Sequence, residues 1–324
     1  MFLRSNIIRL FSICIIISFV ITFLIGVLPV SLDSCNCENF IESSTSTKNI
    51  EKKKYFIDVN KPKLAILVPF RDRFDELLQF APYINKFLLK QNVPHDIFIL
   101  NQIDRYRFNR ASLINTGFLF TKENYDYIAM HDVDLLPLND NLHYDYPETG
   151  PLHIASPDFH PKYHYPTFVG GILLVKREHF QLVNGMSNKY WGWGLEDDEF
   201  YVRIKNAGLQ IQRPKNITTG VNNTFSHIHD RKHRKRDTTK CYNQREETRK
   251  RDYDTGLNTL KYNITKINQL IIDDTNITVL NIQLFCDRKL TPWCDCEDKY
   301  ETVVAANANS KKTNNNPSNK KRLK

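Results

Sequence analysis

The sequence alternates short apolar runs with helical patterns, and this alternation constrains the fold more than any other feature. Apolar runs at 63–69, 96–100 and 127–130 have the length and composition of buried strands. Between them, the segments 77–88 and 109–123 carry apolar residues at helical spacing, and Pro82 is expected to kink or break the first of these helices. The order strand, helix, strand, helix, strand predicts an open parallel α/β sheet, whose ligands bind beyond the carboxyl ends of the strands. Two late segments, 256–264 and 278–285, are predicted to add an antiparallel pair of strands.

An acidic sequence, HDVD at 131–134, directly follows the third apolar run. If the chain is still extended there, Asp132 and Asp134 point to the same side. Neighbouring carboxylates repel each other unless a cation or a donor lies between them, and Mg²⁺ or Mn²⁺ can bridge carboxylates to phosphates. The pattern indicates a metal site for a nucleotide diphosphate. The simpler alternative is a polar strand end that turns into a loop.

A sequence rich in tryptophan and glycine, YWGWG at 190–194, precedes four consecutive acids at 196–199. Glycine beside tryptophan is typical of a loop that opens and closes over a ligand, and we expect that the two tryptophans are not both core residues. The acids fall in the first turn of a predicted helix, where the macrodipole favours negative charge. Capping explains one or two of them, and a general base beside a sugar hydroxyl explains the others.

Two histidines, His227 and His229, share one side of an extended chain and could bind a metal together with the Asp-x-Asp sequence. A structural role is the alternative.

Arg71 and Arg73 follow the first strand, where they could bind a phosphate or remain solvated in a loop. The basic segment 231–251 is predicted to be near-helical and mostly solvated. Three of its members could reach a pyrophosphate: Arg234, Lys235 and Arg236.

The N-terminal region predicts the compartment. Residues 10–32 carry no charge and are long enough to span a bilayer, whereas the apolar region of a cleaved signal peptide would be shorter. Arg4 and Arg9 precede this segment, so the positive-inside rule places the remainder in the lumen. We predict a cytoplasmic tail (1–9), a transmembrane signal anchor (10–32), a stem (33–61), a catalytic domain (62–300) and a disordered tail (301–324).

Other features agree with a luminal domain. Asn-x-Thr patterns for glycosylation begin at four asparagines: Asn216, Asn222, Asn263 and Asn276. Six cysteines follow the anchor, and we predict a disulfide between Cys286 and Cys294, which flank a short polar turn, while the other pairings stay open.

The net charge of +9 suggests an anionic partner, but a luminal domain argues against nucleic acid. A glycine-rich dinucleotide fingerprint is absent from the sequence, which argues against NAD or FAD.

Several ordered motifs together resemble the β-1,4-galactosyltransferases, and most closely the branch that adds galactose to xylose on proteoglycan core proteins. The resemblance runs from about residue 64 to 294. It rests on VPFRDR at 68–73, FNRA at 108–111, HDVDLLPLN at 131–139, YHY at 163–165, FVGGIL at 168–173, NGMSN at 184–188, WGWGLEDDEF at 191–200, HIHD at 227–230 and GLNT at 256–259. The His-x-His pair and TPWC at 291–294 indicate the xylose-acceptor branch.

The resemblance implies a GT-A fold that binds UDP-galactose and Mn²⁺, and a single-pass type II Golgi membrane protein. Asp134, His227 and His229 match metal ligands, and Asp197 matches the catalytic base. Leu195, Glu196, Asp197 and Asp198 match the acceptor pocket. Positions that match the UDP-galactose site are Pro69, Phe70, Arg71, Asp72, Arg73, Phe108, Asn109, Arg110, Val133, Asp134, Tyr163, Trp193, His227, His229 and Arg236.

The implied reaction is an inverting transfer of galactose from UDP-galactose to the 4-hydroxyl of β-xylose on proteoglycan core proteins. Two alternatives remain at this stage: an N-acetylglucosamine acceptor, and a sugar-binding protein without catalysis. The chain departs from the family pattern in Asn223, an extra residue before the histidines, in Leu195, which often has a polar counterpart, and in the sequence after Cys294.

Overall fold

The computed structural model describes residues 15, 18, 58, 60–229 and 234–296. The chain divides into two units, 1–53 and 54–324, of which the first contains two described residues, Ile15 and Ser18. The predicted cytoplasmic tail, the disordered tail and nearly all of the anchor and stem lie outside the described residues. Within the part of the chain that is described, no helix is both long and apolar enough to cross a membrane.

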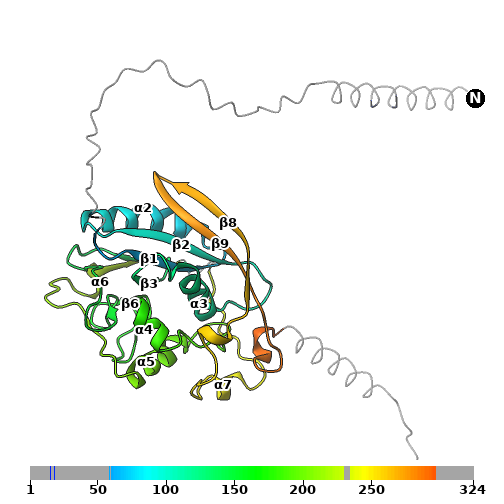
Figure 1. The fold of residues 1–324 in the computed structure, drawn as a ribbon. Coiled ribbons are helices and arrows are strands. Elements are labelled where there is room, and N and C mark those ends of the chain that lie inside the picture. The colour runs from blue at the N-terminus through cyan, green and yellow to red at the C-terminus, as the bar shows by residue number, and fades with distance from the viewer. Residues whose placement is uncertain (1–14, 16–17, 19–57, 59, 230–233, 297–324) are drawn as a thin grey trace, which may run out of the picture. The chain divides into compact units, whose positions relative to one another are not determined.

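A seven-stranded mixed sheet forms the centre of the second unit, in the order β5-β6-β3-β1-β2-β9-β8 (Figure 1). The strands are β1 (Leu64–Phe70), β2 (His95–Gln102), β3 (Tyr127–His131), β5 (Leu152–His153), β6 (Ile172–Lys176), β8 (Tyr262–Ile272) and β9 (Thr275–Leu284). β1 pairs in parallel with β2 and with β3, which confirms the parallel centre. β6 pairs antiparallel with both β3 and β5, so the sheet is mixed.

The late strands differ in part from the prediction. β8 and β9 pair antiparallel, but β9 itself runs parallel to its neighbour β2. The predicted strand beginning at residue 256 is instead a short 3₁₀ helix, η1 (Leu257–Thr259), before β8 starts. Gly256 and Leu257 lie against Asn184, whose carbonyl accepts a hydrogen bond from the Leu257 amide at 2.9 Å, so this segment is occupied in packing on the preceding loop.

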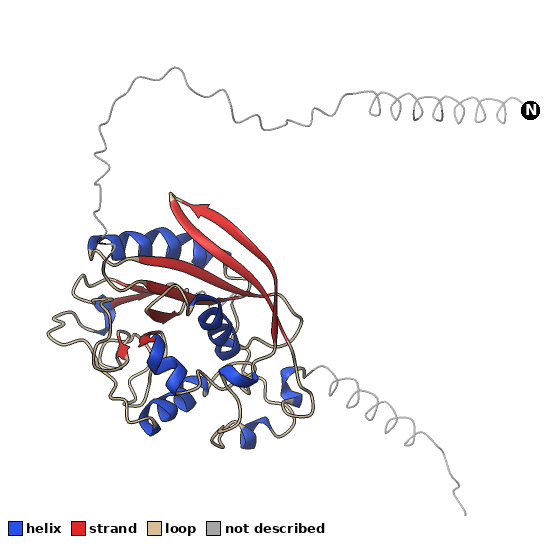
Figure 2. Ribbon diagram, viewed as in Figure 1, coloured by secondary structure: helices blue, strands red, loops and turns tan. Residues whose placement is uncertain are grey.

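Helices cover both faces of the sheet (Figure 2). Helix α2 (Phe74–Lys90) packs in one core cluster, and α3 (Arg110–Thr121), α4 (Arg177–Leu182) and α5 (Glu196–Asn206) pack in the other. α2 continues through Pro82, so the expected break does not occur, and buried Phe80, Ala81 and Ile84 hold this part of the helix on the sheet. Asn109 caps α3 by accepting a hydrogen bond from the Ser112 amide.

The remaining elements lie around the carboxyl ends of the strands. β4 (Leu135–Pro137) and β7 (Phe225–His227) form a separate two-stranded sheet, preceded by α6 (Val221–Thr224). The predicted helix in the basic segment is wrong for residues 234–240, which have no regular structure, and α7 (Gln244–Glu247) is short. A segment that is polar on all sides has no apolar stripe with which to pack as a helix.

Two disulfides tie the end of the domain together, next to the 3₁₀ helix η2 (Pro292–Cys294). The predicted Cys286–Cys294 pair is confirmed, and Cys241 pairs with Cys296.

Candidate active site

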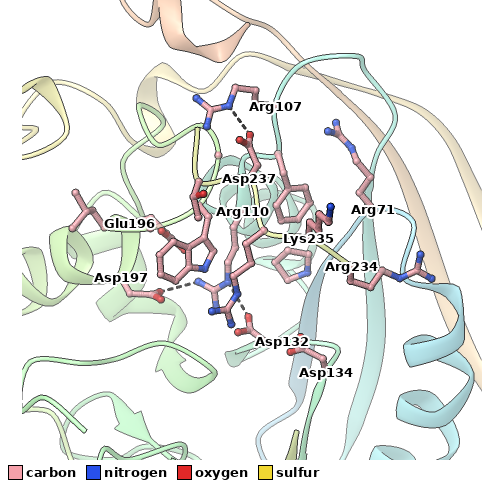
Figure 3. A pocket seen from close by; sticks show the side chains of 18 of the residues that line it. Arg71, Arg107, Arg110, Asp132, Asp134, Glu196, Asp197, Arg234, Lys235 and Asp237 are labelled. Atoms are coloured by element: carbon pink, nitrogen blue, oxygen red, sulfur yellow. Dashed lines mark hydrogen bonds and ion pairs between the residues drawn. The ribbon is translucent and has the colours of Figure 1, made fainter. Parts of the chain in front are cut away.

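A cleft of about 1540 Å³ opens at the carboxyl ends of β1, β2 and β3 (Figure 3). Nearly all of the predicted site residues line it: Pro69, Arg71, Asp72, Arg73, Phe108, Arg110, Val133, Asp134, Tyr163, Trp193, Leu195, Glu196, Asp197, Asp198, His227, His229 and Arg236. Phe70 and Asn109 do not line the cleft. Phe70 belongs to the core of the sheet, and Asn109 is buried at the start of α3, where its side chain supports the neighbouring residues.

The small β4–β7 sheet brings the Asp-x-Asp and His-x-His sequences together. His227 lies opposite Leu135 in this pairing, and the Ile228 amide donates a hydrogen bond to the Asp134 carbonyl at 2.9 Å. Oδ2 of Asp134 consequently lies 3.2 Å from Nδ1 of His229 and 3.9 Å from Nε2 of His227. The three predicted metal ligands therefore meet, although they come from positions more than 90 residues apart in the sequence.

Burial and the neighbouring positive charges favour the neutral form of both imidazoles. Burial lowers the pKa of His227 to about 3 and that of His229 to about 4, with Lys162 and Arg73 respectively adding to the effect. Burial, together with Asp132, raises the pKa of Asp134 to about 6. A neutral imidazole has a lone pair to offer a cation, so a carboxylate and two imidazoles are a donor set that fits a divalent metal such as Mn²⁺.

Positive side chains lie beside this donor set. A terminal guanidinium nitrogen of Arg73 is 2.8 Å from Nδ1 of His229, and Nζ of Lys162 is 3.0 Å from each ring nitrogen of His227. In this conformation, no three histidine, cysteine, aspartate or glutamate side chains within the described ranges have the geometry of a metal site. The donors are thus assembled but not in coordinating geometry, and the nearby cations partly neutralise the carboxylate.

The two acids of the Asp-x-Asp sequence have different partners, contrary to the expectation that they share one side of an extended chain. Residues 133 and 134 form a turn, and Asp132 faces Arg110. Nε of Arg110 is 2.9 Å from Oδ1 of Asp132, and Nη1 is 2.9 Å from Oδ1 of Asp197 (Figure 3). One largely buried guanidinium therefore joins the turn after β3 to the first turn of α5.

The Asp197 carboxylate lies directly against the backbone of Gly170. A Cβ on Gly170 would overlap Oδ2 of Asp197, so glycine is required for this close approach. His153 donates a hydrogen bond from Nε2 to the Gly170 carbonyl at 2.8 Å, and the Asp132 amide donates to the Gly171 carbonyl at 2.9 Å. Burial raises the pKa of the Asp197 carboxyl, whereas the charge of Arg110 opposes that rise.

We expect the Gly170→Ala variant to lower kcat by about tenfold or more, because the added methyl group displaces the carboxylate that is predicted to act as the general base. The measurement is steady-state kinetics, with circular dichroism to confirm folding. Gly220→Ala is the matched control, because a Cβ at Gly220 meets no atom within 4 Å. Equal kcat values for the two variants would contradict this role for Gly170.

The tryptophan-rich loop combines one core residue with one cleft residue, which agrees with the expectation that only one of the two tryptophans, at most, is a core residue. Trp191 is 3% exposed and Trp193 is 44% exposed. The Trp193 ring centroid is 5.0 Å from the Arg236 guanidinium, and Arg236 also donates a hydrogen bond to the Tyr163 hydroxyl at 2.7 Å. The Trp193 amide donates to the Asp237 carbonyl at 2.8 Å, so the loop is attached to the basic segment.

Sequence reasoning missed several residues that line the cleft. Arg107 donates a hydrogen bond to Asp237 at 2.6 Å (Figure 3), and it packs so closely on Gly192 that a Cβ there would overlap its guanidinium. Tyr165 lies beside Asp198, and burial together with that carboxylate raises the pKa of the tyrosine. The long connection 139–167 is rich in proline, histidine and tyrosine, but this composition does not single out Tyr165.

The arrangement defines a class of protein. A mixed α/β sheet carries an acidic turn and two histidines at the carboxyl ends of its strands, and an acid on the facing helix lines the same cleft. This is a glycosyltransferase fold of the GT-A type.

Comparisons with known proteins identify the family. Residues 23–147 match the "N-terminal region of glycosyl transferase group 7", and residues 150–229 match the "N-terminal domain of galactosyltransferase". β-1,4-Galactosyltransferase 7 of Drosophila melanogaster is 67% identical over 247 residues, 76% of each chain. The xylosylprotein 4-β-galactosyltransferase of Caenorhabditis elegans is 50% identical over 237 residues, 72% of this chain and 82% of that protein.

A solved structure agrees with these relatives. It is a mutant of the Drosophila β-1,4-galactosyltransferase 7 in complex with manganese, UDP-Gal and xylobiose. Its sequence is 68% identical, the TM-score is 0.72, and the match covers 72% of this chain and 99% of the other. The chain described here belongs to the β-1,4-galactosyltransferase family.

Proposed function

We propose that this protein is a Mn²⁺-dependent, inverting galactosyltransferase that moves galactose from UDP-galactose to the 4-hydroxyl of β-xylose on proteoglycan core proteins. The observation that carries the proposal is the shared cleft, in which the carboxylate–imidazole set and Asp197 belong to one site connected through Arg110. The relatives named above and the ligands of the Drosophila structure support the donor, the metal and the xylose acceptor.

Asp134, His227 and His229 would hold the metal, which supplies charge neutralisation of the departing diphosphate. Arg73 follows β1 beside this donor set and can bind the donor's diphosphate. The Arg71 guanidinium instead donates hydrogen bonds to the carbonyls of Gln102, Asp104 and Tyr106, so its role is to hold the wall of the cleft. The hydroxyl of the acceptor attacks the anomeric carbon as Asp197 accepts its proton at a carboxylate oxygen. Attack from the face opposite the leaving group converts the α-linked donor to a β-linked product.

Arg110 and Trp193 prepare the site for this step. Arg110 holds the Asp197 carboxylate in place and stabilises its charged form, since its guanidinium opposes the effect of burial on the Asp197 pKa. Trp193 presents an exposed indole to the cleft, and its flat face suits stacking on a sugar ring. Leu195, Glu196 and Asp198 surround the position of the acceptor in this proposal.

Product analysis tests the proposal. The protein, UDP-galactose and Mn²⁺ are incubated with a β-xyloside and, in parallel, with an N-acetylglucosaminide. We expect a β-1,4-linked galactosyl-xyloside and at least about tenfold lower transfer to the glucosaminide, because a site built for one sugar discriminates against the other. Transfer to the glucosaminide alone would contradict the acceptor, and no transfer to either would contradict catalysis.

The metal ligands lead to a separate prediction. We expect Asp134→Asn to weaken Mn²⁺ binding by at least about 10- to 100-fold, because the change removes the one anionic ligand of the set. The measurement is calorimetric titration of Mn²⁺ in the presence of UDP. Asp140→Asn is the control, since Asp140 is exposed, pairs with Lys90 and does not line the cleft. Unchanged affinity in Asp134→Asn would remove this aspartate from the ligand set.

We also propose a single-pass type II Golgi membrane protein with a luminal catalytic domain. The uncharged segment 10–32, the positive residues before it and the two disulfides of the domain support an anchor and an oxidising compartment.

A further inference from the structure

One edge of the central sheet carries exposed apolar side chains. β8 is the last strand in the sheet order, and among the described strands none pairs with its outer side (Figure 2). Ile267, Leu270 and Ile271 on this strand are 49%, 41% and 71% exposed. Apolar edge strands invite pairing with other chains, which charged side chains and bulges oppose. Lys266 and the register shift beside it protect the start of β8, but residues 267–272 carry no charge.

The two faces of the β8–β9 hairpin differ in what covers them. On one face, Ile277 and Val279 of β9 pack in the same core cluster as α2. On the other face, Ile267 lies opposite Leu280, which is buried in the cluster that includes α3. Further toward the hairpin turn on that second face, Ile271 lies opposite Asn276 and is largely exposed. The α3-side covering therefore ends before the turn.

Asn276 begins an acceptor pattern for N-linked glycosylation at the uncovered position. Its side chain is exposed, and Thr278, two residues further on, points to the same face. Side chains directly opposite on antiparallel strands have Cβ atoms about 5 Å apart, so a group attached to Asn276 starts beside Ile271. Pyranose rings present C–H groups on their faces, and these can pack on an isoleucine side chain.

We propose that Asn276 carries an N-linked glycan and that this glycan covers Ile271 and Ile267. The proposal rests on the secretory location proposed above. The glycan shields apolar surface and, because it is bulky and hydrophilic, it also prevents another chain from adding a strand to β8. The glycan is attached at the edge of the sheet formed by β9 and β8, away from β1 and β3. None of Asn276, Ile271 and Ile267 lines the cleft.

The other three acceptor patterns are not placed for this role. The register shift in β8 turns Asn263 to the opposite face from Ile271, opposite Gln283. Asn216 lies in a loop with a positive φ of 59°, and the Thr224 hydroxyl of the pattern at Asn222 is buried and hydrogen-bonded to the Gly220 carbonyl. Asn263 is therefore a matched control, because it is exposed on the same hairpin but on the other face.

The experiment expresses the full chain in insect cells and maps glycopeptides by mass spectrometry. We expect a glycan at Asn276. The Asn276→Gln and Thr278→Ala variants should both lose it and shift in size-exclusion chromatography toward larger species, with unchanged kcat and KM of the unassociated fraction. Thr278→Ser retains the acceptor pattern and should behave as the parent. Adding Ile271→Thr to Asn276→Gln should restore the parent elution, and Asn263→Gln should not alter it.

The outcomes separate the parts of the proposal. An unmodified Asn276 beside glycans at other positions overturns the assignment of the site, and a parent-like elution of Asn276→Gln overturns the shielding. Absence of glycan from all four patterns overturns both this proposal and the secretory location. Galactosyl transfer measured on the same preparation tests the proposed reaction independently.

Discussion

The Asp197→Asn variant is expected to lose galactosyl transfer by about 10³-fold, because general-base catalysis contributes roughly 10²- to 10⁴-fold. The amide is nearly isosteric with the carboxylate, and its oxygen can still accept the hydrogen bond from Arg110. It cannot accept the proton of the attacking hydroxyl. Steady-state kinetics with UDP-galactose and a β-xyloside measure the loss, and calorimetry should show UDP and Mn²⁺ binding within about twofold of the parent, a difference of only about 0.4 kcal/mol.

A matched control keeps the interpretation of this variant specific. Asp254→Asn changes an exposed acid that lies outside the cleft, and its kinetics should match those of the parent. If Asp197→Asn binds UDP and Mn²⁺ normally and still turns over within about tenfold of the parent, which is less than a general base contributes, Asp197 is not the base.

The second large effect is expected from Arg110→Met. Arg110 is 12% exposed and binds Asp132 and Asp197 at once, so its removal leaves two nearby carboxylates without their shared cation. Removing one partner of a fully buried ion pair costs about 3–5 kcal/mol of stability, and the cost here is smaller because Asp132 and Asp197 are 37% and 19% exposed. We expect a lower Tm and, in the folded fraction, a loss of kcat, since the Asp197 carboxylate is no longer held in place. Arg110→Lys should restore little, because one ammonium group cannot reproduce two directed contacts.

A pH profile separates positioning of Asp197 from general destabilisation. Burial raises the pKa of Asp197 and Arg110 lowers it, so removing the guanidinium raises this pKa further. The protonated acid cannot act as a base, and the fall in kcat/KM toward acid pH should therefore begin at higher pH in Arg110→Met. Arg203→Met is the matched control: Arg203 is 11% exposed and joins Glu199 to Asp252 outside the cleft. It should destabilise the fold without shifting the profile, and an equal shift in both variants would contradict the argument for Arg110.

The centre of the sheet could be predicted because its strands and helices have strong, local patterns. β1 and β3 are continuous apolar runs and α2 has an apolar stripe, and the order of strands and helices leaves few topologies open. The edges were harder. The direction of β9 depends on which strand it pairs with, and short-range periodicity does not contain that information. Pro82 was expected to interrupt α2, but tertiary packing of its neighbours outweighs one missing hydrogen bond.

The site was predictable where a motif lies at the end of a predicted strand. Asp134 follows a predicted strand, and the two histidines were expected to join it because a His-x-His pair in extended chain can share one metal; β4–β7 pairing brings them together. The Arg110 bridge could not be foreseen, because Asp132 and Asp197 each have a plausible role in their own motif. Arg107 was missed for a similar reason: its partner Asp237 is 130 residues away, in a segment without apolar periodicity.

The small β4–β7 sheet gives the site a property that the large sheet does not share. Its register contains three residue pairs. Asp134 directly precedes β4 and His229 lies two residues after β7, at the same end of this ribbon. A ribbon this short can open locally while the seven strands remain intact. Any cation that holds Asp134 to the two imidazoles also holds this ribbon closed, so part of its binding free energy is used to order the ribbon. Affinity for the cation is consequently tunable by substitutions in β4 and β7 that never touch it.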